Sequence, residues 1–208
     1  MIILETDRLR LRDYTEEDFE AYYRLKTDER TMYYLPDIKL GDREEALKEF
    51  KEVLADAKSP NRKFYFLHME LKDSQERDSN CDNAGLVDNA SSSATIAPAQ
   101  LGSVGYTVVD NTPVGKIVHL GYFTYEKYWG NGYMTEAVAK VLEFAFTQDN
   151  VYRVTTGCLA ENKGSERVMI KNGMIKEAEH VDYEWHDGKM KTRHEYRLLR
   201  PEWEELHR

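Results

Sequence analysis

The stretch Tyr128-Trp129-Gly130-Asn131-Gly132-Tyr133-Met134 is the feature that most constrains how this chain folds. Two glycines one residue apart follow an aromatic-rich segment that reads as a strand, and an apolar run with helical spacing begins directly after them. Such a turn aims the unpaired amides of a helix's first turn at one point, where the helix dipole favours negative charge. The sequence therefore predicts a cradle for a phosphate group at residues 130–133.

Length and composition indicate a single domain spanning residues 1–208. The chain has 208 residues, of which 41% are hydrophobic, and this is enough to bury a core. The formal net charge of −9 argues against general nucleic-acid binding and slightly favours a cationic substrate such as an amine. Cys81 and Cys158 form neither a disulfide framework nor a metal motif. With no signal peptide and no membrane-spanning run, we expect a cytoplasmic protein that binds no membrane and no metal.

Patterns typical of strand and helix alternate through the first third of the chain. The alternation from Arg8 to Arg12 predicts a first strand, and Thr15 to Asp18 has the form of a capping box that opens a helix. A second helix is expected to begin near Asp42 and to end before Ser59. Between the two helices, the aromatic segment at 32–36 belongs either to a pocket wall or to the core.

A long irregular stretch interrupts the middle of the chain. A strand is predicted from Lys63 to Leu71, and two more over Leu101–Val109 and Lys116–Tyr125. Residues 73–100 lack periodicity and large apolar side chains, so we expect a flexible inserted loop there. A tolerated insertion is the simpler interpretation, and a functional lid is the alternative.

The chain after the glycine turn predicts a strand–helix–strand crossover. The helix leads into a strand at Val151–Leu159, so the strands on either side of the helix should be parallel neighbours. A short helix follows, capped by Asn162 or Gly164 and closed by Gly173.

The last strands form a predicted hairpin around Asp187-Gly188, and Arg200-Pro201 is expected to end the sheet. The fold class is therefore α+β, with one mixed, mostly antiparallel, twisted sheet flanked by helices.

Three stretches of the sequence resemble landmarks of a known family and occur in the same order along the chain. The run from Tyr128 to Ala137 resembles the acetyl-CoA loop of GNAT acetyltransferases, and is closest to the branch of ribosomal-protein amino-terminal acetyltransferases. Leu4–Leu11 is similar to that branch's first strand, and Asn162–Ser165 with Lys171–Met174 resembles its third landmark. The resemblance covers nearly the whole chain apart from residues 73–100, and is far more specific than a lone pair of glycines.

The resemblance implies a GNAT-type sheet, splayed at its centre between the strand ending near Tyr125 and the strand at 151–159, with acetyl-CoA as cosubstrate. The pantetheine arm should follow the backbone around 120–124, with the pyrophosphate on the amides of 130–133. Lys127 stands where relatives carry Arg or Gln, and Met169 where many carry a tyrosine acid. The implied cofactor-binding residues are Leu120, Tyr122, Phe123, Thr124, Lys127, Gly130, Asn131, Gly132, Tyr133, Met134, Asn162 and Ser165.

Acetyl transfer to an amine needs a proton acceptor for the ammonium, donors for the thioester oxygen and a proton source for the departing thiolate. The oxygen donor is expected to be a backbone amide near Tyr122 or Phe123. Ser165 is the candidate proton source by resemblance, although a serine at a helix start is equally well a cap. Glu184 is the candidate base by resemblance, with His119 and a water path as rivals.

The acceptor stays open at this stage. A protein amino-terminal amine is the first expectation by resemblance. A small amine such as a polyamine, aminoglycoside or amino acid is the alternative enzyme substrate. A noncatalytic acyl-CoA sensor remains the alternative from a different class. Both a monomer and a homodimer are compatible with the sequence.

Overall fold

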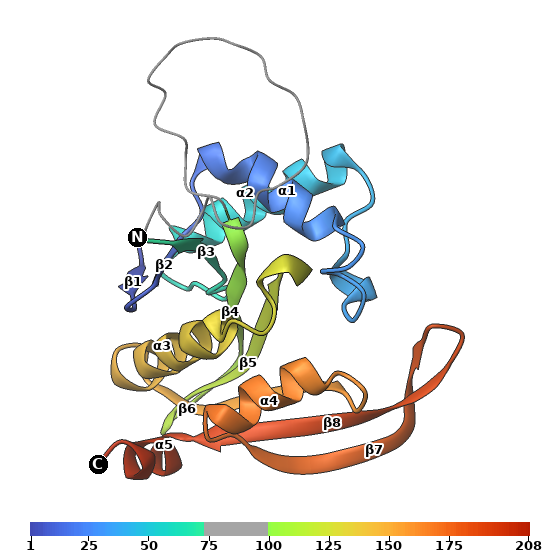
Figure 1. Cartoon of the computed structure of the whole chain (residues 1–208). Coiled ribbons are helices and arrows are strands. Elements are labelled where there is room, and N and C mark those ends of the chain that lie inside the picture. Colours follow the sequence, from blue (N-terminus) through green and yellow to red (C-terminus); the bar gives the residue numbers. More distant parts are fainter. Residues whose placement is uncertain (73–99) are drawn as a thin grey trace.

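The computed structural model describes residues 1–72 and 100–208, and an eight-stranded sheet runs through it (Figure 1). The strands are β1 (Ile3–Glu5), β2 (Leu9–Arg12), β3 (Leu67–Leu71), β4 (Gln100–Thr112), β5 (Gly115–Thr124), β6 (Val151–Leu159), β7 (Ile175–His186) and β8 (Lys189–Leu199). The helices are α1 (Phe19–Thr27), α2 (Arg43–Ala57), α3 (Tyr133–Thr147), α4 (Lys163–Lys171) and α5 (Arg200–Leu206). Short 3-10 turns lie at Glu16–Asp18, Pro36–Ile38 and Glu126–Tyr128.

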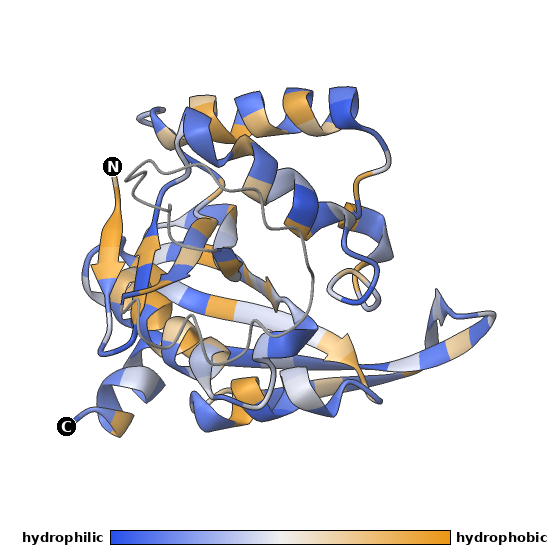
Figure 2. Cartoon of the chain, turned by 45° about the horizontal axis from the view of Figure 1, so that its top comes forward, coloured by the Kyte–Doolittle hydropathy of each residue, from blue (hydrophilic) through white to orange (hydrophobic). Residues whose placement is uncertain are grey.

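The strands lie in the order β1-β2-β3-β4-β5-β6-β8-β7. Every neighbouring pair is antiparallel except β5 and β6, which are parallel because α3 carries the chain back across the sheet between them. This confirms the expected fold class, including the single parallel crossover. The β7–β8 hairpin projects from the body as a long arm in Figures 1 and 2.

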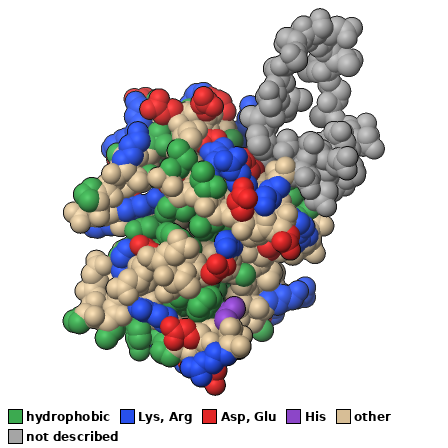
Figure 3. Space-filling view, turned by 90° about the vertical axis from the view of Figure 1, so that its left-hand side faces the viewer, with side chains coloured by type: hydrophobic (Ala, Val, Ile, Leu, Met, Phe, Trp, Pro, Cys, Tyr) green, Lys and Arg blue, Asp and Glu red, His purple; other side chains and the backbone are tan. Residues whose placement is uncertain are grey.

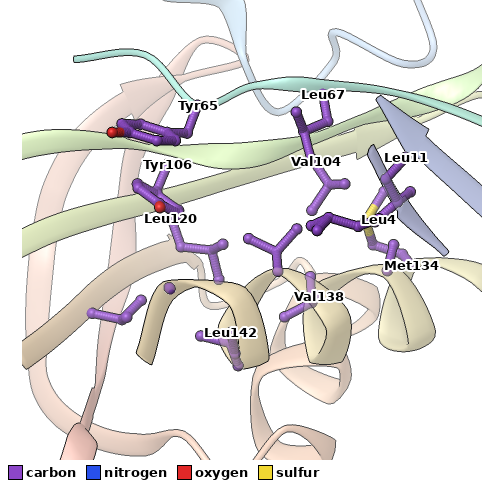
Figure 4. Packing of buried hydrophobic residues seen from close by; sticks show 14 of the residues in the cluster. Leu4, Leu11, Tyr65, Leu67, Val104, Tyr106, Leu120, Met134, Val138 and Leu142 are labelled. Carbon is purple, nitrogen blue, oxygen red and sulfur yellow. The ribbon is translucent and has the colours of Figure 1, made fainter. Parts of the chain in front are cut away.

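The main core forms between the sheet and α3. In Figure 4, apolar side chains of the strands point toward apolar side chains of the helix. The strand residues are Leu4, Leu11, Leu67, Val104 and Leu120, and the α3 residues are Met134, Val138 and Leu142. The helix repeats apolar residues at helical spacing, so one stripe of it is buried along its whole length. In Figure 2 hydrophobic colour is concentrated on α3 and on the strands next to it. Packing on α3 therefore fixes where the glycine turn, which directly precedes this helix, sits relative to β5.

Helices α1 and α2 form a second cluster on the other face of β3. Tyr14, Tyr22 and Phe50 pack within it, and the Tyr14 ring meets His68 of β3 at 5.5 Å between ring centroids. The capping box predicted at Thr15 is present, because the Asp18 carboxylate accepts hydrogen bonds from the Thr15 amide and hydroxyl at 2.7 and 2.9 Å. The second helix is capped as expected by Asp42, whose side chain accepts from the Glu45 amide.

One prediction about the termini was wrong in detail, and the other was confirmed. The amino-terminal segment forms two strands instead of one, because the chain turns at Thr6, whose amide donates to the Leu9 carbonyl, and β1 then pairs back on β2. At the carboxyl end, the sheet ends at Leu199 as predicted, and the chain continues as α5. Pro201 lies in the first turn of α5, and the Glu202 carboxylate accepts from the Leu199 amide at 2.9 Å, which starts a helix.

The loop predicted at 73–100 lies outside the described residues, except for Gln100, which is buried and begins β4. Among the helices of the described ranges, none is both long and apolar enough to cross a membrane. Figure 3 shows acidic and basic side chains interspersed over one face of the molecule, so the net charge of −9 is not concentrated there.

Candidate active site

The parallel strands β5 and β6 separate partway along their length. Their residues are paired only from Lys116 opposite Val151 to His119 opposite Thr155. Beyond this point both strands continue as strands, and in the described part of the sheet they no longer pair with each other. The splay predicted at the centre of the sheet is therefore present. A cleft of about 610 Å³ opens there, lined by both strands, the glycine turn and α4.

The glycine turn closes one end of this cleft. Gly130 and Gly132 both have φ +79°, a left-handed conformation that side chains with a Cβ rarely adopt. Apart from its chain neighbours, no atom lies within 4 Å of the position that a Cβ on Gly130 would occupy. Helix α3 begins three residues later, at Tyr133. The turn therefore leaves open space beside the start of α3, and this arrangement fits a pyrophosphate.

Contacts from the amino-terminal segment hold this turn in place. The Arg8 guanidinium pairs with the Glu136 carboxylate, with both Nε and Nη2 at 2.7 Å from Oε2. Its Nη1 also donates to the Asn131 carbonyl at 3.1 Å, and its centre lies 4.5 Å from the ring centroid of Tyr133. The Thr6 hydroxyl donates to the same carboxylate. Arg8 therefore contacts Asn131 and Tyr133 of the predicted cradle, and Glu136 in the first turn of α3.

The first turn of α4 forms the opposite wall. The Asn162 side chain caps α4 by accepting from the Ser165 amide at 3.1 Å, which confirms Asn162 over Gly164 as the cap. The Tyr122 hydroxyl lies 2.9 Å from the Ser165 hydroxyl and donates to the Ser165 carbonyl at 3.1 Å. Burial raises the pKa of Tyr122, and the Ser165 hydrogen bond opposes this only in part, so the phenol stays protonated at neutral pH. Met169 is fully buried in the core, and the phenol that contacts Ser165 belongs to Tyr122 of β5.

Polar side chains on the other face of β5, β6 and β8 form a second group. His119 lines the cleft, with Nδ1 at 3.3 Å from the Thr155 hydroxyl. Gly157 is opposite Glu195, and a Cβ on Gly157 would fall 2.5 Å from the Glu195 carboxylate. His119 is exposed at one edge, yet partial burial of its ring is the main cause that lowers its pKa. Glu195 opposes the shift and Arg193 reinforces it. The imidazole is therefore neutral, and able to accept a proton, at neutral pH.

The far end of the cleft lies between the 31–35 segment and the β7–β8 hairpin. Thr31, Tyr34 and Leu35 line it, so the aromatic segment contributes to the wall of the cleft. Tyr34 also stacks on His186 of the hairpin at 5.8 Å between ring centroids. This stacking holds the 31–35 segment against the β7–β8 hairpin, although the two are distant in sequence.

Three carboxylates near this end have cationic partners. Glu161, which lines the cleft, is paired with Lys191. Arg193 pairs with Glu184 at 2.8 Å and with Glu195 at 2.6 Å. The far end of the cleft is therefore polar. Its three carboxylates share two cations, Lys191 and Arg193, so one negative charge is left without a cation of its own.

Most of the predicted site residues meet in this cleft. Those that line it are His119, Leu120, Tyr122, Phe123, Thr124, Gly130, Gly132, Tyr133, Met134, Asn162 and Ser165. Three others do not line it. The Lys127 ammonium lies 4.9 Å from the ring centroid of Tyr128, the Asn131 side chain donates to the Trp129 carbonyl, and Glu184 reaches the cleft only through Arg193.

Comparison with known families decides the identity of the fold. A family model described as an acetyltransferase (GNAT) domain matches residues 8–175. The chain belongs to the GNAT acetyltransferase family. This GNAT enzyme is an acyltransferase that uses acetyl-CoA as its cosubstrate.

One relative matches it over almost its entire length. An uncharacterized N-acetyltransferase, YoaA of Bacillus subtilis, is 26% identical over 96% of this chain and 97% of its own. Among solved structures, the ribosomal-protein-S5-alanine acetyltransferase of Vibrio fischeri superposes with a TM-score of 0.69 at 18% identity, over 98% and 99% of the two chains. The spermidine N-acetyltransferase of Vibrio cholerae, in complex with CoA and spermine, gives 0.70 at 14% identity, over 95% and 99%. At these identities, the structural matches establish the shared fold.

Some residues of this GNAT site escape detection from sequence. Arg193 and Glu195 reach His119 only through the register of β6 with β8, and a strand of alternating charges gives no sign of it. The Arg8–Glu136 pair joins positions 128 residues apart. Arg8 and Glu136 each lie within a stretch that resembles a family landmark, and this was the available signal. Nothing in the sequence indicates that these two stretches are in contact.

Proposed function

We propose that this GNAT enzyme acetylates the amine at the amino terminus of a protein, with a ribosomal protein as the first substrate to test. The observation that carries the proposal is that the three carboxylates at the far end of the cleft, where the acceptor would bind, are already paired with two cations, which leaves one negative charge for a single substrate amine. A polyamine has several cationic centres, and its binding favours carboxylates free to pair with them. Glu161, Glu184 and Glu195 are instead each engaged by Lys191 or Arg193. A peptide brings one amine and a polar backbone, which suits a wall of paired charges and aromatic rings.

In the proposed mechanism, acetyl-CoA supplies the activated acetyl group and the chain's own residues hold it and move protons. The amides of residues 130–133 hold the pyrophosphate, and the edge of β5 that has left β6 offers backbone groups along 120–124 to the pantetheine arm. Asn162 contacts that arm in addition to capping α4. A backbone amide near Tyr122 or Phe123 donates to the thioester oxygen as its charge develops.

Two groups on opposite faces of β5 are assigned the proton transfers. His119 accepts the proton of the attacking ammonium, because it is neutral at neutral pH and lines the cleft. The hydroxyls of Ser165 and Tyr122, 2.9 Å apart, relay a proton to the departing sulfur. Glu184 does not line the cleft, so we assign it to hold Arg193 in place, with Glu195 as the carboxylate nearer to His119.

The test is an acceptor screen with purified protein and acetyl-CoA. Peptides with a free amino terminus, the same peptides with a blocked terminus and one internal lysine, and spermidine are compared by mass spectrometry of the products. We expect one acetyl group on the free-terminus peptides and none on the blocked ones. Acetylation of spermidine in preference to every peptide would favour the small-amine alternative, and no transfer despite acetyl-CoA binding would favour a sensor.

Two variants connect any activity to the site. Ser165→Ala and Tyr122→Phe should each lower kcat while leaving the affinity for acetyl-CoA nearly unchanged, and the double variant should lose little more than the worse single one if the hydroxyls act as a unit. We propose that the reaction takes place in the cytoplasm, where acetyl-CoA and newly made amino termini occur together.

A further inference from the structure

The wall of the cleft formed by α4 carries two cations without a protein partner. Arg167 and Lys171 both line the cleft and both are exposed. They are four residues apart in α4, so they lie on the same face of the helix. Within residues 1–72 and 100–208, neither side chain has a hydrogen-bond or ion-pair partner.

The other cations of the cleft are engaged. Lys163 pairs with Glu166 at 2.8 Å, and Arg193 pairs with Glu184 and Glu195. Together with Arg167 and Lys171, these two are all the lysine and arginine residues that line the cleft in the described structure. A side-chain cation that is free of carboxylates on a cleft wall is available to an anionic ligand. Arg167 and Lys171 therefore differ from the cations at the far end of the cleft, which are paired with carboxylates.

Their position relative to the glycine turn is fixed. The Asn172 side chain, next to Lys171, donates to the Thr135 carbonyl in the first turn of α3 at 3.3 Å and to the Val168 carbonyl at 2.8 Å. The end of α4 is thus tied to the start of α3, directly after the pyrophosphate cradle. Ser165 lies six residues before Lys171 in α4, which is about 9 Å along the helix axis at 1.5 Å per residue. The two cations are at the nucleotide end of the cleft.

We propose that Arg167 and Lys171 bind the ribose 3′-phosphate of acetyl-CoA and make the enzyme selective for the 3′-phosphorylated nucleotide. The pyrophosphate is provided for by backbone amides and the dipole of α3. The remaining anion of the cosubstrate is a phosphate monoester with a charge near −2 at neutral pH, and it requires side-chain cations. An arginine fork binds a phosphate through two hydrogen bonds, and the lysine adds a point charge.

The experiment measures binding without turnover. The purified full chain is titrated by calorimetry with CoA and with 3′-dephospho-CoA, in the wild type and in Arg167→Gln, Lys171→Gln and the double variant. We expect the wild type to prefer CoA roughly tenfold at low salt, each single variant to prefer it less, and the double variant to be within about twofold of no preference. The preference of the wild type should shrink as salt is added, because both side chains are exposed.

Lys189→Gln is the matched control. It removes one positive charge at the start of β8, beside the hairpin turn and outside the cleft, and should leave the preference unchanged. The proposal is overturned if the wild type does not distinguish the two ligands or binds neither, or if the double variant keeps the full preference. It is also overturned if the double variant loses the same factor for both ligands, because the cations then serve the pyrophosphate. Since no acceptor is present, the outcome is independent of the proposed amine substrate.

Discussion

His119 is the residue whose protonation state should control the rate. Its pKa is lowered chiefly by partial burial, so the neutral form prevails at neutral pH and persists somewhat below the ordinary histidine value of about 6.5. A base is active when neutral, and activity is therefore expected to stay level from neutrality downward and to fall only as the pH passes through the lowered pKa. His119→Gln should reduce kcat/KM by about a hundredfold at pH 7 and abolish this acid limb.

The measurement is the initial rate against pH with saturating acetyl-CoA. Glu184→Gln serves as the comparison: if Glu184 only holds Arg193, that variant keeps the acid limb of the wild type. A His119→Gln enzyme that retains the limb would instead assign the base to a carboxylate or to a water path.

Arg8 is the residue whose removal should specifically weaken cosubstrate binding. In Arg8→Gln, the Asn131 carbonyl loses its donor and the Glu136 carboxylate is left without its cation at the start of α3. Both effects act against an anion on the first-turn amides, so the Kd for acetyl-CoA should rise roughly tenfold, with little change in the KM of the acceptor. Adding Glu136→Gln removes the uncompensated charge and should restore part of the affinity. An unchanged Kd in Arg8→Gln would mean that the turn holds its shape without this pair.

At the scale of single elements, the link between β2 and the start of α1 should give the fold an acid-sensitive contribution. Burial by itself raises the pKa of Asp18, but hydrogen bonds from Arg12 and Thr15 outweigh it and lower the pKa to about 2. A lowered carboxyl pKa stabilises the fold above the unfolded value of about 3.9, and this stabilisation is lost as the pH falls from there to about 2. Asp18→Asn should therefore cost about 2 kcal/mol at pH 7 and about half as much at pH 3.

Urea unfolding of both proteins at several pH values measures this difference. Glu20→Gln, which removes an exposed carboxylate paired with Arg43, should change stability little at any pH. A deficit of Asp18→Asn that is the same at pH 7 and pH 3 would point to lost packing instead of lost charge.

Elements defined by local chemistry were predictable from the sequence. Asp42 and Asn162 cap helices through their side chains, and Asp18 accepts from Thr15 at the start of the first helical segment. Both Asp187 and Gly188 adopt the positive φ that a two-residue hairpin needs. The three-residue β1 was missed because it is held mainly by pairing with β2. The local signal for α5 was present in Pro201 and Glu202, but its position after a strand suggested an end to the sheet.

The same distinction explains the site. The glycine turn and the Asn162 cap depend on neighbours in sequence, so they were found where expected. The role expected for Glu184 depended on the face that its strand presents. The pairing of β7 with β8 shifts between His180 and Glu184, where Asp182 has φ 49°, so counting along the strand does not tell which way Glu184 points.

At the scale of the whole molecule, the sheet consists of two parts joined by a short seam. The first part runs from β1 to β5 and the second comprises β6, β8 and β7, and between them only the residues near His119 and its partner Thr155 pair across the parallel junction. Beyond the seam, backbone groups of β5 that face β6 have no strand partner in the described structure. Acetyl-CoA bound in the cleft would contact β5 on one side and α4 on the other, and would therefore connect the two parts.

This connection predicts a stabilisation that is localised to the splay. At a CoA concentration of 100 times Kd, the free energy of unfolding should rise by about 2.7 kcal/mol, which corresponds to an increase in Tm of roughly 5 to 10 °C for a chain of this size. Hydrogen exchange should slow for amides within 120–124 and 130–133, while amides of β2 and β3, far from the seam, change only by the global increase. Gly132→Glu places bulk and charge in the cradle, and should show neither effect. Protection spread evenly over the sheet, or an equal shift in the Gly132→Glu protein, would mean that CoA stabilises the fold without bridging its two parts.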